Sequence, residues 1–284
     1  MAQTTLRMAL LAATEQLAAT DQLTLGPTAR RDAELLLLHL LGRDRAWLLT
    51  HLDDLLPDEY TAAYAQRLAR RARQEPVQYI LGEQEFWGLK LHVAADVLIP
   101  RPETEHLVEA ALARLPKGQP AKIADIGTGS GAIALALATE RPEAQISALD
   151  QSPAALTIAL ENAQKHGVAG RIRFLASDLL AAVPGERFTM IVSNPPYVPS
   201  GEQLEAQVRD YEPHSALFAG EDGLAIYRRL IPEAWDALEP GGWLLLEIGH
   251  GQRDALAAML SDWLGAEFLP DLQGILRIAV AQHP

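Results

Sequence analysis

The chain has 284 residues, of which 49% are hydrophobic and 21% charged, a composition typical of a folded protein with a substantial core. It has no cysteine, which excludes disulfides, thiolate metal sites and a cysteine nucleophile. The net charge is −13, and residues 76–284 carry −12 of it. So acidic a chain argues against wrapping nucleic acid by phosphate neutralisation, although it leaves room for a small basic contact site.

Targeting and metal signals are not visible in the sequence. Residues 1–11 lack a signal-peptide pattern, and the leucine-rich run at 35–41 is far shorter than the ~20 residues that span a bilayer. The eight histidines form no ligand-spaced pair. We therefore expect a cytoplasmic protein without a membrane segment or a metal site.

The first 75 residues carry a helical pattern. Apolar residues recur three and four positions apart over residues 6–17, and Thr28 and Asp58 are suitable helix caps. Breaks such as Gly26-Pro27 divide the stretch. The pattern predicts a bundle of four or five helices over residues 1–75.

Four arginines, at positions 67, 70, 71 and 73, follow one another closely near the end of this bundle. Such a run is more typical of a solvated helix face than of a binding site. Contact with RNA or a protein is the functional alternative.

Residues 76–100 are predicted to form a β-hairpin linker. Two β-rich stretches, 77–81 and 89–93, are separated by a segment with glycines at both ends. Residues 97–105 then lead into a helix that is expected to end near Leu115, because proline followed by acidic residues is a good helix start.

From residue 121 onward, strands alternate with helices. The apolar runs predict strands at 122–126, 145–149, 171–175, 188–193, 243–248 and 275–280, and the periodic segments predict helices at 132–139, 153–166, 223–238 and 253–263. This alternation indicates an α/β fold, with residues 101–284 forming a Rossmann-like domain around a mostly parallel sheet. The stretch 199–222 has few regular signals and is predicted to be a functional or mobile loop.

A glycine-rich segment, Asp125-Ile126-Gly127-Thr128-Gly129-Ser130-Gly131, joins the first of these strands to its helix. Glycines let the backbone approach a ligand closely, and the helix N-terminus presents unpaired N–H groups. Gly127, Gly129 and Ala132 also fit the G-x-G-x-x-A dinucleotide fingerprint, and Asp150 follows Gly127 by 23 residues, where a ribose-binding carboxylate belongs. The segment therefore leaves open a nicotinamide cofactor and S-adenosylmethionine.

The tetrad Asn194-Pro195-Pro196-Tyr197 follows the buried strand at 188–193. Proline cannot continue a sheet ladder, so Asn194 is expected at the carboxyl end of the strand, where α/β folds bind ligands. The Asn194 side-chain oxygen and the Pro195 carbonyl offer two acceptors for the hydrogens of a planar NH2 group, and Tyr197 offers a flat wall. Taken alone, the tetrad also fits an ordinary strand-to-loop exit.

Ser177-Asp178-Leu179 follows the third strand. A short carboxylate here can accept from an adenine amino group while Leu179 packs on the ring, and a turn cap is the alternative role for Asp178. The order of motifs resembles class I S-adenosylmethionine-dependent methyltransferases. The tetrad resembles that of members acting on a planar nitrogen, namely DNA adenine, the amino groups of guanine or a glutamine side-chain amide.

Further segments resemble one family within that class. They are Glu75–Gly82, Glu85-Phe86, Leu98–Glu105, Tyr211-Glu212-Pro213 with Ala216-Leu217, and Asp222-Gly223-Leu224. Together they are similar to the HemK/PrmC family, the release factor glutamine methyltransferases, from Glu75 to about Gly249, and the helical bundle agrees with that family.

This resemblance implies methyl transfer from S-adenosyl-L-methionine to N5 of the glutamine in the Gly-Gly-Gln motif of class I peptide chain release factors, leaving S-adenosyl-L-homocysteine. It implies that the Gly127–Gly131 loop faces the methionine part of the cofactor, Asp150 the ribose, and Asp178 with Leu179 the adenine. Asn194 to Tyr197 would hold the glutamine and form the catalytic set, with Asn194 also beside the cofactor.

The resemblance also implies roles outside these motifs. The bundle would recognise the release factor, and Phe86 with residues 101–103 would close over the site. Glu247, at a strand end, is expected either to support the site or to face solvent. We expect a monomer that binds no nucleic acid stably.

Three other functions stay open at this point. A DNA adenine methyltransferase shares the chemistry but needs a basic cleft, which the charge disfavours. A nicotinamide-dependent oxidoreductase would bind NADH instead of S-adenosylmethionine. An adaptor docking on the translation machinery through residues 67–73 would keep its binding after loss of Asn194.

Overall fold

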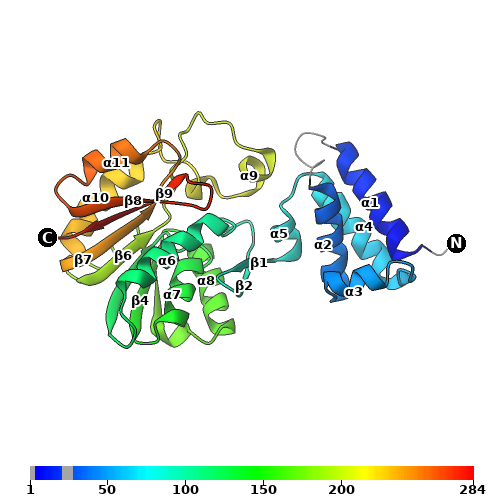
Figure 1. The fold of residues 1–284 in the computed structure, drawn as a ribbon, viewed down its shortest axis with the longest axis horizontal. Helices are drawn as coiled ribbons and strands as arrows, with labels where there is room; N and C mark the ends of the chain where they lie inside the picture. The colour runs from blue at the N-terminus through cyan, green and yellow to red at the C-terminus, as the bar shows by residue number, and fades with distance from the viewer. Residues whose placement is uncertain (1–3, 21–27) are drawn as a thin grey trace. The chain divides into compact units, whose positions relative to one another are not determined.

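A computed structural model describes residues 4–20 and 28–284 of the chain (Figure 1). The predicted break at Gly26-Pro27 lies outside the described residues. The chain divides into two compact units, one made of residues 1–82 with 204–211 and the other of residues 83–203 with 212–284.

The first unit is helical in its described residues, as the apolar spacing predicted. Its helices are α1 (Leu6–Thr20), α2 (Ala29–Leu41), α3 (Arg45–Thr50), α4 (Asp58–Ala72), α5 (Val77–Leu81) and the distant α9 (Ala206–Tyr211). The apolar stripes of α1 and α2 meet in a core that includes Leu17, Leu36 and Leu37. Thr28 occupies the N-cap position of α2, whereas α4 is capped by Pro57 and begins at Asp58.

The prediction of a strand at residues 77–81 is wrong, because these residues form α5. Pro76 precedes the helix, and Gly82 ends it in the left-handed conformation. Val77 and Ile80, three positions apart, bury their side chains in the core of the bundle. Helical spacing of the buried residues therefore outweighed their β propensity.

The arginine run is largely built into the first unit, so the predicted solvated face is wrong for its central member. Arg71 is 4% exposed and its Nε donates to Asp32 at 2.8 Å. Arg70 forms an ion pair with Glu75. Arg67 donates to the carbonyl oxygen of Leu36 at 3.3 Å.

The second unit begins with the predicted hairpin, displaced along the sequence. Strands β1 (Glu83–Phe86) and β2 (Leu89–His92) pair antiparallel. Phe86 is buried in the hydrophobic core beside Leu91, so the prediction that it closes over the site is wrong.

A seven-stranded sheet forms the centre of the second unit. Its strands are β3 (Ala121–Ile126), β4 (Ala144–Asp150), β5 (Ile172–Ala176), β6 (Phe188–Ser193), β7 (Leu238–Glu247), β8 (Leu264–Pro270) and β9 (Leu276–Gln282), in the order β5-β4-β3-β6-β7-β9-β8. The first five strands in that order are parallel, and β9 runs antiparallel to both neighbours. The mostly parallel sheet is therefore confirmed, whereas β8 was not predicted.

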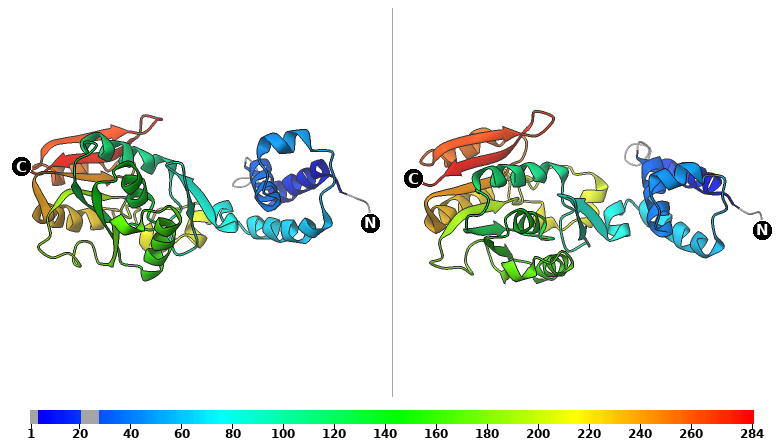
Figure 2. Two further views of the ribbon diagram at one scale, coloured as in Figure 1. Left: turned by 90° about the horizontal axis from the view of Figure 1, so that it is seen from below. Right: turned by 60° about the horizontal axis from the view of Figure 1, so that its bottom comes forward.

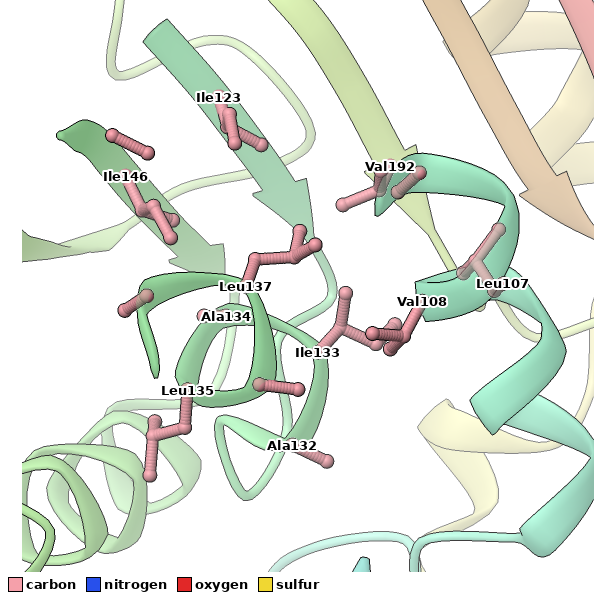
Figure 3. Packing of buried hydrophobic residues seen from close by; sticks show 14 of the residues in the cluster. Leu107, Val108, Ile123, Ala132, Ile133, Ala134, Leu135, Leu137, Ile146 and Val192 are labelled. Atoms are coloured by element: carbon pink, nitrogen blue, oxygen red, sulfur yellow. The ribbon is translucent and has the colours of Figure 1, made fainter. Parts of the chain in front are cut away.

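Helices cover both faces of this sheet (Figures 1 and 2). The helices are α6 (Glu105–Arg114), α7 (Ala132–Glu140), α8 (Pro153–Lys165), α10 (Ala225–Ala237) and α11 (Arg253–Met259), with 3-10 turns η1 (Pro102–Thr104), η2 (Ala169–Arg171) and η3 (His214–Ala216). In the cluster drawn in Figure 3, Leu137 of α7 lies toward Ile123 of β3, and Ile133 lies beside Val108 of α6. The strand order reverses between β3 and β6, which opens a ligand-binding crevice at their carboxyl ends.

Candidate active site

The glycine loop after β3 is fastened to the neighbouring strand. The backbone N–H groups of Gly127 and Thr128 both donate to the carbonyl oxygen of Leu149, at 2.8 and 3.0 Å. Gly127 and Gly129 have φ of 72° and 54°, a conformation that glycine adopts without strain. A Cβ on Gly127 would meet no atom within 4 Å. The backbone at this position is therefore open to a ligand.

The buried carboxyl group of Asp125 stabilises the glycine loop through hydrogen bonds. Asp125 is 0% exposed, and its Oδ2 accepts from the Thr128 hydroxyl at 2.6 Å and from the Ala134 N–H at 3.2 Å. Burial raises the pKa of Asp125 to about 7. Thr128 and Ser130 are also buried. Of the five loop residues predicted to contact the cofactor, Gly127 and Gly129 line a cavity at this edge of the sheet, whereas Thr128, Ser130 and Gly131 do not.

Asp150 ends β4 and presents its carboxylate beside the loop. Its Oδ2 accepts from the N–H of Gly129 at 2.9 Å, and its Oδ1 accepts from the N–H of Ser152 at 2.8 Å. Each carboxylate oxygen has a second acceptor site left for a ligand hydroxyl.

Asp178 and Leu179 form the next part of the rim. Asp178 is exposed and forms an ion pair with Arg229 of α10 at 2.8 Å. Leu179 has φ of 49°, which is unusual for a leucine, and its carbonyl oxygen accepts from the Ser177 hydroxyl at 2.8 Å. Arg229 was missed because α10 follows Asp178 by about 50 residues and carries no motif.

Asn194 follows β6 at the carboxyl edge of the sheet, as predicted. The hydroxyl of Ser193 donates to the carbonyl oxygen of Ile126 at 2.6 Å, which ties the end of β6 to the start of the glycine loop. The Asn194 Nδ2 group donates to Thr104 Oγ1 at 3.1 Å. Thr104 was not predicted as part of the site.

Tyr197 does not line the cavity, and two glycines lie close to it, Gly223 at its backbone carbonyl and Gly249 at its ring. A Cβ on Gly223 would overlap the Tyr197 carbonyl oxygen, and one on Gly249 would lie 3.1 Å from Tyr197 Cδ2. Gln252 Nε2 donates to the same carbonyl oxygen at 3.0 Å. The Tyr197 hydroxyl donates to Glu247 Oε1 at 3.4 Å. Burial, and then the Glu247 charge, raises the Tyr197 pKa above its ordinary value.

Glu247 is 2% exposed, so the solvent-facing alternative is wrong. Burial raises its pKa to about 7, while interactions with the Thr104 hydroxyl, Arg277 and Tyr197 oppose that rise. Among the described residues, Glu247 Oε2 has no hydrogen-bond partner.

Glu212 is a second buried carboxylate. It belongs to the Tyr211-Glu212-Pro213 motif, but the sequence predicted no role for it. Its Oε2 accepts from the Ile99 N–H at 3.2 Å, and its Oε1 accepts from Arg101. Glu212 therefore holds residues 99–101 in place. Residues 95–98, which come directly before them, line the cavity.

These elements enclose a cavity of about 290 Å³ at the carboxyl ends of β3, β4 and β6. Its lining includes Gly127, Gly129, Asp150, Asp178, Leu179, Asn194, Pro195 and Pro196. Open glycine backbone, carboxylate acceptors and apolar side chains such as Leu149 and Ile226 suit a ligand with a ribose, a base and a positive charge. Within residues 4–20 and 28–284, no cluster of side chains could hold a metal ion, and no helix is long and apolar enough to cross a membrane.

Comparisons with known proteins agree with this architecture. The model of the methyltransferase small domain matches residues 104–210, and that of the PrmC N-terminal domain matches residues 9–82. The fold resembles the 16S rRNA N2 methyltransferase of Thermus thermophilus, with a TM-score of 0.55 at 19% identity over 71% of this chain and 50% of that chain. It also resembles a methyltransferase from Pyrococcus furiosus, with a TM-score of 0.51 at 17% identity over 77% of this chain and 98% of that chain. The chain is a class I S-adenosylmethionine-dependent methyltransferase, which excludes the oxidoreductase and adaptor alternatives.

Curated relatives narrow the class further. Proteins named release factor glutamine methyltransferase are 46% identical over 283 residues in Koribacter versatilis, covering 99% of both chains, and 46% identical over 269 residues in Escherichia coli, covering 93% of this chain and 96% of the other. The chain belongs to the release factor glutamine methyltransferase family.

Proposed function

We propose that this protein methylates the N5 amide nitrogen of the glutamine in the Gly-Gly-Gln motif of class I peptide chain release factors, and so modulates translation termination. The observation that carries this proposal is that Asn194 and Pro195 line the same cavity as Gly127, Gly129 and Asp150. An acceptor pair suited to a planar amide therefore lies next to the groups suited to the cofactor. The names of the relatives favour the same substrate.

The cavity residues fit S-adenosylmethionine, which supplies a methyl group on a positively charged sulfur. The open backbone at Gly127 and Gly129 would lie along its methionine part. Asp150 would accept from the ribose hydroxyls, and Asp178 from the adenine amino group, with Leu179 against the ring. The carboxylates also favour a cationic ligand over a neutral one.

The tetrad would orient the substrate amide. An amide nitrogen is a poor nucleophile because its lone pair is delocalised into the carbonyl. Asn194 Oδ1 and the Pro195 carbonyl would accept its two hydrogens, which holds the amide plane and directs the nitrogen at the methyl carbon. Holding reacting atoms about 3–3.5 Å apart supplies most of the acceleration in such reactions. One amide proton leaves to water after transfer, so no side chain has to remove it beforehand.

The first unit would recognise the body of the protein substrate. The α9 segment, which follows the tetrad in the sequence, belongs to this unit. Its Tyr211 hydroxyl donates to the carbonyl oxygen of Arg73 at 2.7 Å, and Arg71 donates to Gln207 at 3.3 Å. The stretch 199–222 is therefore more regular than the sequence predicted, and we propose that it contributes to holding the release factor. A cytoplasmic monomer that binds no nucleic acid stably fits this role.

The test is mass spectrometry of a purified class I release factor after incubation with the protein and S-adenosylmethionine. One added methyl group on the Gly-Gly-Gln glutamine is expected. Asn194→Ala should lower the rate about 100-fold or more, because the amide is no longer oriented, while calorimetry shows cofactor affinity retained. Gln273→Ala, which truncates an exposed amide side chain of the same unit, is the control.

Two results would contradict the proposal. An unmodified release factor, despite measured binding of S-adenosylmethionine, would rule out this substrate. Near-normal turnover by Asn194→Ala would remove the tetrad from the reaction.

A further inference from the structure

We propose that Thr104 and the buried Glu247 fix which end of the Asn194 side-chain amide faces the substrate, and that both are positioning residues for methyl transfer. The inference rests on the proposed function, in which Asn194 must act as an acceptor. It assigns a role to two residues that lie behind the cavity lining.

The orientation of Asn194 matters because the two ends of an asparagine amide have nearly the same shape and opposite hydrogen-bonding character. The oxygen accepts, whereas the NH2 group donates. A half-turn of the side chain would present an NH2 group to the NH2 group of the substrate glutamine, and neither could accept from the other. Shape alone does not prevent this half-turn, so a specific partner is required.

Thr104 is that partner. The Asn194 Nδ2 group donates to Thr104 Oγ1 at 3.1 Å, and Thr104 is buried. This bond occupies the NH2 end and leaves Oδ1 for the substrate. A hydroxyl can also donate, however, so Thr104 on its own could form a hydrogen bond with either end of the Asn194 amide. The direction of its single O–H has to be fixed by a third group.

Glu247 fixes that direction. Its carboxyl group is buried, and the Thr104 hydroxyl interacts with it in the sense that favours the ionised form. Above pH 7, where the Glu247 carboxyl group is mostly ionised, it only accepts hydrogen bonds, so it draws the one hydroxyl proton of Thr104 toward itself. The Thr104 oxygen is then free to accept from Asn194. The inferred direction of donation is from Asn194 to Thr104, at 3.1 Å, and from the Thr104 hydroxyl toward Glu247.

The same carboxyl group holds the other end of the tetrad. The Tyr197 hydroxyl donates to Glu247 Oε1 at 3.4 Å, and the Tyr227 hydroxyl donates to the backbone carbonyl oxygen of Glu247 at 2.7 Å. Thr104 reaches the site because it ends the 3-10 turn η1, which begins at Pro102. The Pro-Glu-Thr segment before α6 thus acquires a function in orienting Asn194.

Amide hydrogen exchange tests the orientation without any substrate. The chain has only two asparagines, Asn162 and Asn194, so selective ¹⁵N labelling gives two pairs of side-chain amide signals, assigned with Asn194→Ala. Asn162 Nδ2 donates to the carbonyl oxygens of His92 and Ser130, at 3.0 and 2.9 Å, and serves as an internal control for folding.

In the wild type, the Asn194 Nδ2 protons should exchange more slowly than those of an exposed amide. Thr104→Val, which keeps the shape and removes the hydroxyl, should remove that protection while the Asn162 signal is unchanged. Equal exchange at Asn194 in the wild type and in Thr104→Val would overturn the inference.

Turnover tests the consequence for catalysis. Thr104→Val should lower kcat for release factor methylation about 10- to 100-fold, the range for losing a hydrogen bond that orients a reacting group, with unchanged affinity for S-adenosylmethionine. Thr104→Ser, which restores the hydroxyl, should recover most of the rate.

The two proposals can fail separately. If the wild type methylates the release factor and Thr104→Val does so equally well, this inference is wrong and the proposed function stands. If the wild type leaves the release factor unmodified, the proposed function is wrong, and the exchange measurement decides the orientation of Asn194 independently.

Discussion

Glu247→Gln should make the stability of the second unit less dependent on pH. Burial raises the pKa of Glu247 from 4.5 to about 7, so the folded protein holds a proton that the unfolded chain has already lost between these values. Stability from this group is complete below pH 4.5 and is lost as the pH rises through 7. Glutamine has nearly the same shape and does not titrate, so it removes that loss.

The size of the effect follows from the pKa difference. Each pKa unit corresponds to about 1.4 kcal/mol, so Glu247 should lower the free energy of unfolding by about 2–3 kcal/mol between pH 5 and pH 8. The facing groups, Arg277, Tyr197 and Glu103, are already part of the pKa. The pKa of Asp125 is also raised to about 7, so Asp125 should lower the free energy of unfolding by a similar amount between pH 5 and pH 8. The wild type should therefore lose about twice as much as Glu247→Gln.

Urea unfolding followed by tryptophan fluorescence at pH 5, 6, 7 and 8 measures this difference. Four of the five tryptophans lie in the second unit, and only Trp47 lies in the first. The quantity to compare is the slope with pH, because any constant cost of the substitution cancels. Glu239→Gln, the same change at an exposed position of β7, should keep the wild-type slope. An unchanged slope in Glu247→Gln would refute the reasoning.

Two further substitutions test the cofactor side of the site. Asp150→Asn replaces one acceptor oxygen by an NH2 group that faces backbone N–H donors, and should weaken S-adenosylmethionine binding about 10- to 100-fold in calorimetric titration; unchanged affinity would place Asp150 outside the site. Gly131→Ala puts a Cβ 2.7 Å from Leu135 Cδ1 at a φ of 84°, and should cost about 2–4 kcal/mol of stability in urea unfolding. Gly167→Ala, with a φ of 70° and open space around its Cβ, is the matched control and should cost only the backbone part, so equal losses would exclude the clash.

The α/β fold was predictable because its signals agree with one another. Apolar runs alternate with helical periods from residue 121 onward, and glycines and prolines separate them. The predictions failed where tertiary contacts or position in the sheet decided the structure. Residues 77–81 form a helix through burial at helical spacing. Most of β8 is exposed or half-buried, so it lacks an alternating apolar signal, and Gly241-Gly242 lie inside β7 although they resemble a turn.

The site was predictable only where function requires residues next to one another in the sequence. The glycine loop and the tetrad each follow a strand directly, and Asp150 is the last residue of one, so the strand pattern locates them. Thr104 reaches Asn194 across 90 positions of the chain, and Arg229 reaches Asp178 across 51. A sequence pattern carries no information about such pairings until the sheet order is known.

The two loops that line the cavity are held in the same way. Asp125 accepts from Thr128 and from the backbone of Ala134 under the glycine loop, and Glu247 accepts from Tyr197 and interacts with Thr104 behind the tetrad. Both carboxyl groups are buried, and in the described part of the chain each keeps one oxygen without a hydrogen-bond partner. Apolar residues would pack there at lower cost in stability. An ionised carboxylate, however, only accepts hydrogen bonds and so fixes the direction of the donors that face it, which is the role inferred for Glu247 behind the tetrad.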